Sequence, residues 1–292
     1  MATVIRKEQL EERSTVRPSL IGEWLRSAGR LTDEDIGKIV SLQRQRNIRF
    51  GEAAIELGLL TEADLHHALS QQFDFAYAEI GTSTLDESLH VAYDPYCAYS
   101  EAIRTLRSQL NLRWFATGRT TLAVIEGRSG DGCSRVAANL AIAFSQAGTR
   151  TLLVDANLRA PTQCRLFGLN TPDGLSGLLA GRTSLIQAMA EVPAFSRLRV
   201  LCAGASVPNP QEMLSRPAFA TLLQTLSSSF EVVIVDCPPL LESADAQLIA
   251  ARCGGCLLVA RQDHTRLEDI QKTRQQLEPS GALVLGATLI GG

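Results

Sequence analysis

The stretch Thr121–Gly148, TLAVIEGRSGDGCSRVAANLAIAFSQAG, decides the fold. It opens with the apolar, β-branched run TLAVIE, which is typical of a buried strand. The glycine-rich turn GRSGDGCS follows at residues 127–134, and a run of small residues then predicts a helix that ends at Gly148. A strand, a glycine loop and a helix in this order form a phosphate cradle, because glycines let backbone N–H groups approach the phosphates and the helix N-terminus adds partial positive charge.

The loop matches the Walker A pattern G-x-x-x-x-G-K-[ST] except at the lysine. Gly127, Gly132 and Ser134 match, whereas Cys133 stands in the place of the lysine. We expect the loop and the first turn of its helix to contact a nucleotide through a weakened set of groups. The expected nucleotide-binding residues are Gly127, Gly130, Asp131, Gly132, Cys133, Ser134 and Arg135.

Few cations are available to replace the missing lysine. The sequence has no lysine between Lys38 and Lys272, so the nearby cations are Arg128 and Arg135. Either arginine is a candidate for partial rescue of phosphate binding, and the sequence does not choose between them.

The composition fits a globular protein of one large and one small domain. The 292 residues are 45% hydrophobic, and the net charge of −3 gives no reason to expect nucleic-acid binding. No apolar run reaches membrane-spanning length and the N-terminus is too charged for a signal peptide, so we expect a cytoplasmic protein. The seven cysteines are scattered, and the Cys253–Cys256 pair lacks the partners that a zinc site needs. We therefore expect buried or bystander cysteines.

Two copies of one unit occupy the N-terminal region. GEWLRSAGRLTDEDIGKIVSLQ begins at Gly22, and GEAAIELGLLTEADLHHALSQ begins 29 residues later at Gly51. Each copy predicts a short helix that ends at a glycine, then Thr32 or Thr61 as an N-cap, and then a second helix. We expect the two repeats to pack into a small helical domain over residues 15–80. The polar, aperiodic stretch 81–94 predicts a linker.

These repeats resemble the N-terminal domain of type II secretion and pilus ATPases, over residues 20–75. In some relatives such repeats bind cyclic di-GMP through R-L-G at the start of each copy. Here the second copy has Arg49-Phe50-Gly51, but the first has Leu20-Ile21-Gly22, which lacks the arginine. The resemblance therefore favours a protein-docking domain over a cyclic di-GMP site.

Apolar runs alternate with helical patterns over residues 95–292. This alternation predicts an α/β fold, a mainly parallel sheet with helices on both faces. The expected strands are Thr121–Ile125, Thr151–Val154, Leu198–Leu201, Val232–Val235, Cys256–Val259 and Leu283–Leu289.

Two of these strands end in an acid. LLVDANLRAP ends its strand at Asp155, with Asn157 two positions on, and VVIVDCPPLL ends its strand at Asp236. Ligands of such sheets bind outside the carboxyl ends of the strands. We expect Asp155 and Asp236 to be the catalytic acids and to hold Mg²⁺ together with the Ser134 hydroxyl.

The three loops together resemble the bacterial tyrosine kinases of the polysaccharide-export type. Those proteins carry a Walker A loop, then L-[LI]-[VI]-D-x-D-x-R-x-P, then [VI]-[IV]-[VI]-D-x-P-P, and here these are GRSGDGCS, LLVDANLRAP and VVIVDCPPLL. A P-P-N-P-x-E-[LM]-L segment of the family is matched by VPNPQEML at 207–214. With a secretion-ATPase-like module ahead of it, the chain is similar to the chain-length-determinant tyrosine kinases of the EpsG type.

The resemblance implies P-loop NTPase architecture and an ATP-dependent tyrosine kinase, but three chemical parts are missing. Cys133 replaces the lysine, Asn157 replaces the second acid of D-x-D, and no tyrosine follows Tyr99, so the autophosphorylated tail of the family is absent. We expect weak binding of ATP or ADP with Mg²⁺ and little or no kinase activity. One alternative is an active autokinase whose acceptors are Tyr93, Tyr96 and Tyr99, although a packing seam of tyrosines is preferred. A second alternative is a MinD/ParA-like localisation ATPase.

The resemblance also implies partners. The family's E-x-x-R-x-x-R oligomerisation helix is matched by Glu101, Arg104 and Arg107, which predicts a homo-oligomer. An inner-membrane regulator of polysaccharide chain length is the expected partner, and it would bring the cytoplasmic chain to the membrane periphery.

Overall fold

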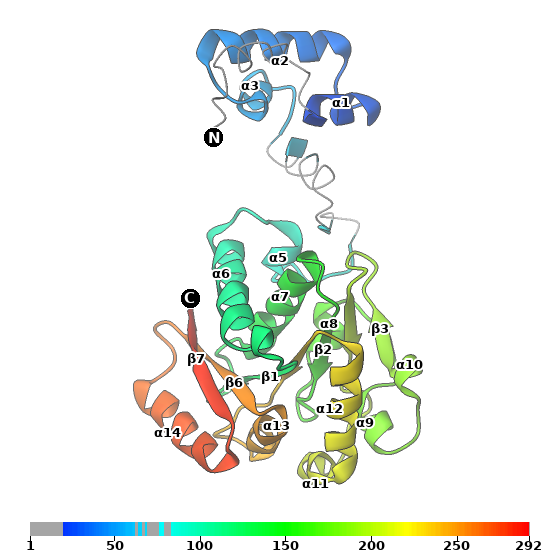
Figure 1. Ribbon diagram of the computed structural model, residues 1–292, viewed down its shortest axis with the longest axis vertical. Coiled ribbons are helices and arrows are strands. Elements are labelled where there is room, and N and C mark those ends of the chain that lie inside the picture. Colours follow the sequence, from blue (N-terminus) through cyan, green and yellow to red (C-terminus); the bar gives the residue numbers. More distant parts are fainter. Residues whose placement is uncertain (1–19, 62–63, 66–67, 69–75, 79–82, 292) are drawn as a thin grey trace, which may run out of the picture. The chain divides into compact units, whose positions relative to one another are not determined.

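The chain divides into two compact units, Met1–Ala76 and Tyr77–Gly292. The computed structural model describes residues 20–61, 64–65, 68, 76–78 and 83–291 (Figure 1). Parts of the expected helical domain and of the expected linker, residues 15–19, 62–63, 66–67, 69–75 and 79–82, lie outside the described residues. No helix in the described ranges combines the length and the apolar character needed to cross a membrane.

The first unit confirms the helical repeat where it is described. Asp35 N donates to Thr32 Oγ1 at 3.2 Å while the Asp35 carboxylate accepts from the Thr32 backbone, and the Thr61–Asp64 pair makes the same bonds. Such reciprocal bonds satisfy N–H groups that a helix start leaves unpaired. The repeated cap explains why the 29-residue period is visible in the sequence. The described helices are α1 (Leu20–Ser27), α2 (Asp33–Arg46) and α3 (Phe50–Glu56).

The second unit is built on a seven-stranded sheet with the order β3-β4-β2-β5-β1-β6-β7. All neighbouring strands pair in parallel except β3 with β4, so the expected, mainly parallel α/β sheet is confirmed. The six expected strands all form, and the short antiparallel strand β3 is an addition. The strands are β1 (Thr121–Glu126), β2 (Thr151–Asp155), β3 (Met189–Glu191), β4 (Leu198–Leu201), β5 (Val232–Asp236), β6 (Gly255–Arg261) and β7 (Leu283–Ile290).

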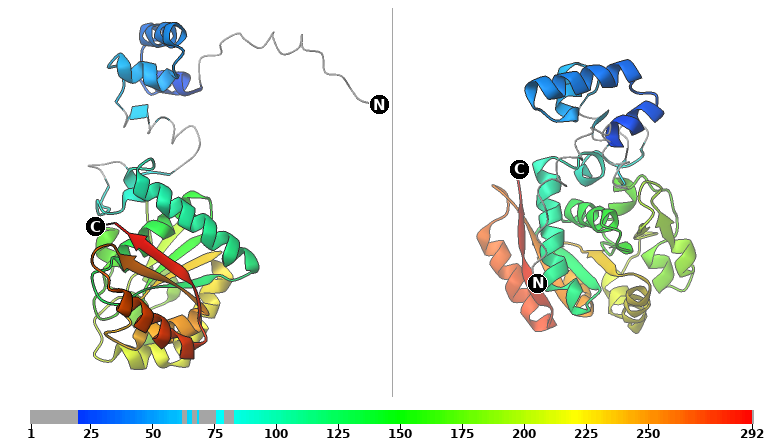
Figure 2. Two further views of the ribbon diagram at one scale, coloured as in Figure 1. Left: turned by 90° about the vertical axis from the view of Figure 1, so that its left-hand side faces the viewer. Right: turned by 45° about the horizontal axis from the view of Figure 1, so that its top comes forward.

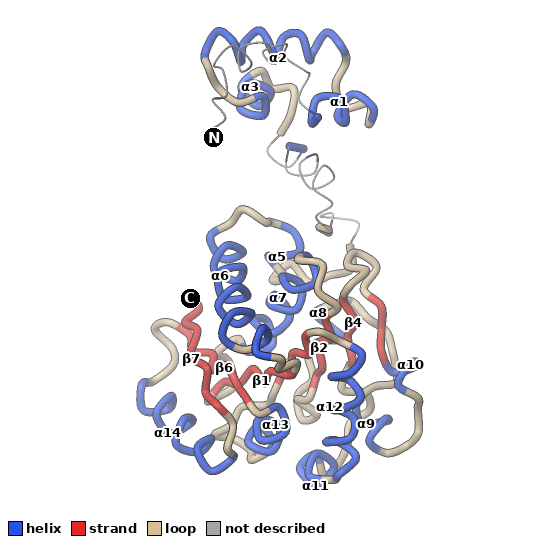
Figure 3. Tube along the Cα trace, viewed as in Figure 1, coloured by secondary structure: helices blue, strands red, loops and turns tan. Residues whose placement is uncertain are grey.

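Helices cover both faces of this sheet (Figure 3). On one face α7 packs along β1, β2 and β5, with α5 and α6 against it, and on the other face α12 and α13 pack on β5 and β1. Figure 2 shows β7 at the edge of the sheet, beside α14. The longer helices are α6 (Ala98–Arg113), α7 (Cys133–Gln146), α12 (Pro217–Ser229), α13 (Asp245–Cys253) and α14 (Leu267–Leu277). The shorter ones are α5 (His90–Tyr93), α8 (Gln163–Leu166), α9 (Leu175–Leu179), α10 (Leu185–Ala188), α11 (Pro210–Ser215) and the 3₁₀ turns η2 (Phe115–Thr117) and η3 (Glu278–Ser280).

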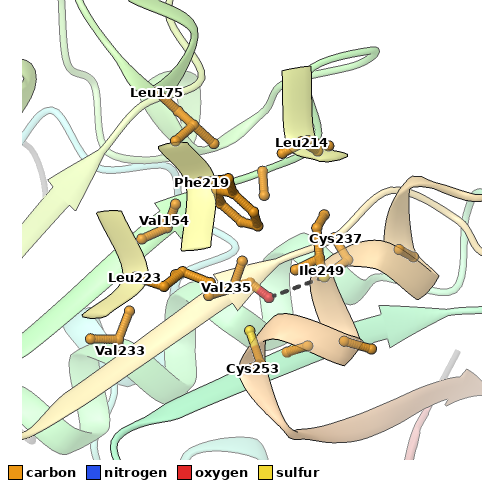
Figure 4. Close-up of a cluster of buried hydrophobic side chains, with 14 of the residues drawn as sticks. Val154, Leu175, Leu214, Phe219, Leu223, Val233, Val235, Cys237, Ile249 and Cys253 are labelled. Carbon is orange, nitrogen blue, oxygen red and sulfur yellow. Dashed lines mark hydrogen bonds between the residues drawn. The ribbon is translucent and has the colours of Figure 1, made fainter. Parts of the chain in front are cut away.

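One hydrophobic core lies between the sheet and the layer of α12 and α13. Phe219 and Leu223 of α12 contribute to it from one side, and alternate residues of the strands, such as Val154 and Val235, from the other (Figure 4). Because β5 and β2 are covered on both faces, every residue of these two strands is buried. This packing holds the carboxyl ends of β2, β5 and β1 side by side, and the loops that follow them lie along one edge of the sheet.

The stretch expected to be a linker is, where described, part of the second unit. Leu89 and Val91 are fully buried, and the backbone N–H of Val91 donates to Asn139 Oδ1 on α7 at 3.0 Å. The backbone N–H of Asp86 donates to the Leu166 carbonyl at 2.8 Å. The polar composition of this segment hides the few apolar positions that pack, so the structure differs from the sequence-based expectation here.

Two of the cysteines that were expected to be buried or bystander residues form a disulfide. Cys164, on α8, and Cys202, directly after β4, form a disulfide that closes a sequence separation of 38 residues. The other described cysteines, Cys97, Cys133, Cys237, Cys253 and Cys256, are free, and all of these except Cys97 are buried. The pairing depends on two segments that only the fold brings together.

Candidate functional site

The glycine loop has the backbone geometry of a phosphate cradle. It leaves β1 at Gly127 and enters α7 at Gly132, whose φ of 88° lies in the left-handed region that favours glycine. A Cβ on Gly132 would lie 2.6 Å from Ile290 Cδ1, and one on Gly127 would lie 2.8 Å from Thr273 Oγ1. The loop is therefore held closely between the end of β7 and α14, and the start of α7 presents its backbone N–H groups.

The two predicted acids lie beside each other at the ends of neighbouring strands. Asp155 and Asp236 are opposite each other in the β2–β5 register, and neither is exposed. Asp155 Oδ2 accepts hydrogen bonds from the backbone N–H groups of Thr162 at 3.0 Å and Gln163 at 2.9 Å. Gln163 Nε2 donates to Asp236 Oδ2 at 2.6 Å. The structure thus brings the acids together and fixes both through the segment that leads into α8.

Burial sets the protonation of this pair. It raises the pKa of Asp155, and burial together with the neighbouring charge of Asp155 raises the pKa of Asp236. The Ser134 side chain is hydrogen-bonded to Asp236, which acts in the opposite direction. Two carboxylates that repel one another in a buried place are stabilised by a shared proton or by a cation.

The residues at this edge fit a hydrated magnesium ion. Within the described ranges no group of three or more His, Cys, Asp or Glu side chains could hold a metal, so a cation would rely on two carboxylates and the Ser134 hydroxyl. Mg²⁺ is commonly bound by one or two carboxylates, with water and phosphate completing the shell. Two buried oxygen atoms nearby, Thr162 Oγ1 and Gln163 Oε1, have no hydrogen-bond partner among the described residues and are available to such water.

Cys133 offers no charge to a phosphate. Its Sγ donates to the Val124 carbonyl at 3.1 Å and lies 3.6 Å from Asp236 Oδ1. The residue is almost fully buried, and burial and the charges of Asp236 and Glu126 raise the pKa of its thiol. At neutral pH the position of the Walker lysine therefore holds a neutral thiol that faces the acids.

The other predicted loop residues are held by neighbouring elements. Asp131 Oδ1 accepts from Thr265 Oγ1 at 2.5 Å and lies 3.1 Å from His264 Nδ1, which ties the loop to the turn after β6. Arg128 pairs through Nε with Asp269 Oδ2 at 3.0 Å, so one of the two candidate cations is directed to α14. Arg135 is exposed and extends near the cradle, because its Nη2 would lie 3.8 Å from a Cβ on Gly132.

Asn157 is occupied by a turn. Its Oδ1 accepts the backbone N–H of Ala160 at 3.1 Å, and its own backbone N–H donates to Asp155 Oδ1 at 3.2 Å. Arg159, two residues on, forms a bidentate ion pair with Asp245 at the start of α13, with Nε 2.7 Å from Oδ2 and Nη2 3.3 Å from Oδ1. The segment after β2 is thus stabilised by local contacts in which Asn157 accepts a hydrogen bond as a neutral amide.

A groove of about 550 Å³ lies beside the cradle, between α6 and the end of β7. Its lining includes Arg135, Arg261 and Tyr99, with apolar side chains such as Ile103 and Leu289. A cationic rim and an apolar wall suit a flat, partly apolar group attached to an anion. The groove is therefore the candidate place for the nucleoside part of a nucleotide.

The residues expected at an oligomer interface have partners within the chain. Arg107 Nη1 donates to the Ala143 carbonyl of α7 at 2.8 Å, and Arg104 Nη2 lies 2.6 Å from Glu101 Oε2. Arg107 thus joins α6 to α7, while Glu101 is exposed and the half-buried Arg104 also donates to the Pro95 carbonyl.

The three candidate acceptor tyrosines differ in burial and in their contacts. The Tyr93 hydroxyl donates to the Leu85 carbonyl at 2.6 Å, and Tyr99 stacks edge-on against His90 at 5.3 Å between ring centroids. Burial raises the pKa of Tyr99 to about 12. Tyr96 is 56% exposed. Two of the candidate acceptors are therefore packing residues, and one lies at the surface.

Three residues at the site were not predicted from the sequence. Glu126 Oε2 accepts the backbone N–H of Cys133 at 3.2 Å, Glu242 Oε1 accepts that of Ser129 at 2.9 Å, and Gln163 connects the two acids. Glu126 ends an apolar strand at the same edge as Asp155 and Asp236, so the rule that identified those acids also points to it. No comparable signal marks Gln163 or Glu242.

The comparisons with known proteins find a P-loop NTPase family and tyrosine-protein kinases. A ParA family model, described as that of the NUBPL iron-transfer P-loop NTPase, matches residues 118–287. The putative tyrosine-protein kinase CapB of Staphylococcus aureus is 32% identical over 201 residues, which are 69% of this chain and 88% of that protein.

Two solved structures are similar over most of the chain. The chimerical protein CapA2B2 has 31% sequence identity and a TM-score of 0.66, over 76% of this chain and 97% of its own. The kinase domain of the Escherichia coli tyrosine kinase ETK has 29% identity and a TM-score of 0.69, over 73% of this chain and 84% of its own.

Proposed function

Since the chain belongs to the family of bacterial tyrosine-protein kinases built on a ParA-type P-loop domain, we propose that it is a degenerate member that binds Mg-nucleotide weakly and does not autophosphorylate on tyrosine. The observation that carries this proposal is the neutral, buried thiol of Cys133 at the lysine position. Phosphoryl transfer depends on positioning and on stabilising the charge of the transferred group, and removal of one such stabilising group commonly costs orders of magnitude in rate.

The rest of the site supports a loss of kinase activity, although the residues that would bind Mg²⁺ are still present. Asn157 is a neutral amide engaged in a turn, so it cannot act as a base toward an acceptor hydroxyl. Ser134, Asp155 and Asp236 would hold Mg²⁺, and when bound the ion would neutralise phosphate charge. ATP or ADP would then be held by backbone donors of the loop, with Arg135 as the nearby cation.

We propose that the chain acts in exopolysaccharide export. An inner-membrane regulator of chain length is the proposed partner, with the chain in the cytoplasm and at the membrane periphery only through that partner. The helical first unit would act as a protein-docking module. The α6 face that carries the exposed Glu101 and the half-buried Arg104 is the proposed contact between copies of the chain, with Arg107 anchoring the helix behind it.

The test is incubation of the purified full chain with Mg-ATP, followed by mass spectrometry of its tyrosine peptides. We expect no phosphate on Tyr93, Tyr96 or Tyr99, in the wild type and in Asp155→Ala alike. Stoichiometric phosphate on any of the three that disappears in Asp155→Ala would establish the active-autokinase alternative and overturn the proposal. Tyr96 is the residue to inspect first, because it is exposed.

A further inference from the structure

A carboxylate of the chain itself lies against the phosphate cradle. Glu126 Oε2 accepts the backbone N–H of Cys133, the first residue of α7, at 3.2 Å. The backbone N–H groups of Asp131 and Gly132 lie near the same carboxyl group, and together with that of Cys133 they act to lower its pKa. In a loop of this kind these consecutive N–H groups are the ones that hold an anionic oxygen.

The position of Glu126 explains how its side chain reaches the loop. It is the last residue of β1, seven residues before Cys133, and the loop returns over the strand end to begin α7. Its neighbours on the strand, Val124 and Ile125, are fully buried, whereas Glu126 is half-buried. Burial raises its pKa and the loop N–H groups oppose that shift, so the loop compensates for part of the desolvation of the carboxylate.

Neither the lysine position nor Arg128 supplies a positive charge to pair with this carboxylate. Cys133 is a neutral thiol there, and Arg128 is paired with Asp269 outside the cradle. The N-terminal end of a 14-residue helix favours a negative charge, and Glu126 supplies one. The carboxylate of Glu242 also accepts a loop N–H, but from the exposed Ser129, four residues before the helix starts.

We propose that Glu126 is a built-in competitor for the phosphate site, whose carboxylate occupies the Cys133 N–H, beside those of Asp131 and Gly132, and must leave before a nucleotide polyphosphate can bind. The proposal rests on the nucleotide site proposed above and names a residue that controls access to it. A polyphosphate and the carboxylate need the same donors, so removing Glu126 exposes donors that are already in place.

The experiment measures Mg-ADP and pyrophosphate binding by calorimetry, in the wild type and in a Cys133→Lys background. Glu126→Ala removes the occupant, Glu126→Gln removes the charge but keeps an oxygen that can accept the same N–H groups, and Glu242→Gln is the matched control. We expect Glu126→Ala to tighten binding by about ten-fold, the scale of one hydrogen bond to a charged group. Glu126→Gln should gain less than Glu126→Ala, and Glu242→Gln less than about three-fold, as a screened surface charge.

Amide resonances supply a readout that needs no nucleotide. In ¹⁵N–¹H spectra of the full chain, Glu126→Ala should shift the Gly132 and Cys133 amides, whereas Glu242→Gln should shift Ser129 instead. Unshifted Gly132 and Cys133 amides would overturn the proposed occupancy.

The outcomes separate this inference from the proposed function. If Cys133→Lys binds ADP and Glu126→Ala changes nothing in that background, the competition is wrong while the nucleotide site stands. If Glu242→Gln gains as much as Glu126→Ala, the effect is general charge repulsion and the occupancy is again wrong. If no variant binds ADP or pyrophosphate, the nucleotide site itself is wrong, and the competition falls with it.

Discussion

The glycine loop and the acid pair lie at the same edge of the sheet, yet they differ in what occupies them. The carboxylates of Asp155 and Asp236 are held by backbone and amide donors from a segment in which Thr162 Oγ1 and Gln163 Oε1 have no hydrogen-bond partner among the described residues. The N–H groups of the loop already bond to the chain's own carboxylates, Glu126 and Glu242. A cation is thus favoured at the acids, whereas an anion at the loop meets competition.

The difference shows that a glycine loop can keep the backbone shape of a phosphate cradle without the positive side-chain charge that usually accompanies it. The left-handed glycines and the close contacts at Gly127 and Gly132 preserve the shape of a phosphate cradle. One substitution, Cys133, together with the carboxylate of Glu126, changes its charge. Variants that change only one of the two regions should therefore have separate effects.

We expect the largest change in stability from loss of the disulfide, which lies next to the segment that holds the acid pair. Opening the bond between Cys164 and Cys202 releases a closed loop of 38 residues, which in the chain-entropy model lowers the free energy of unfolding by about 3–4 kcal/mol. Urea unfolding of the protein with and without a dithiol reductant measures this, with Cys97→Ser as the control for loss of a cysteine that forms no disulfide. Coinciding midpoints would show that the bond contributes nothing.

The acid pair should make stability depend on pH. Because the folded-state pKa values of both acids lie above the ordinary value of 3.8, the folded chain binds these protons more tightly than the unfolded chain. The stability that they contribute is fully present below about pH 4 and is lost as pH rises through the folded-state pKa values. Asp236→Asn should remove much of this loss, on the order of 2 kcal/mol at pH 8.

Thermal unfolding from pH 5 to pH 8 without divalent cations checks this. Glu268→Gln changes an exposed carboxylate and should leave the wild-type pH profile unchanged. Added Mg²⁺ should stabilise the wild type at pH 8 more than Asp236→Asn. A wild type and an Asp236→Asn variant with parallel pH profiles would contradict the predicted repulsion between the acids.

The surface of α6 should contribute least to the stability of one chain. Glu101 is exposed, whereas Arg104 is half-buried and also donates to the Pro95 carbonyl, so Arg104→Glu should lower the free energy of unfolding by about 1 kcal/mol. Its expected effect is on self-association, with a lower mass in light scattering than the wild type. Arg113→Glu, on the same helix, is the control. An equal drop for both variants, or a wild type that stays monomeric at high concentration, would remove this face as the contact.

The parts predicted from sequence are those with a short-range signal. The strands, the loop and the two acids follow from hydrophobic runs and from residues at fixed places beside them. Gln163, the Cys164–Cys202 bond and the packing of Leu89 depend on contacts between distant segments, and nothing in the local sequence marks them. Glu126 is different, because it obeys the strand-end rule and can be found from the sequence in the same way as Asp155 and Asp236.

The most direct test of the central claim, that the loop has lost its affinity for phosphate through charge while keeping its shape, is calorimetry of Mg-ADP binding to the wild type and to Cys133→Lys. A charge-assisted hydrogen bond is worth about 1.5–3 kcal/mol, so restoring the lysine should tighten binding about ten-fold or more. Equal affinity of the two proteins would show that a cation such as Arg135 already serves the phosphates, and it would contradict the claim.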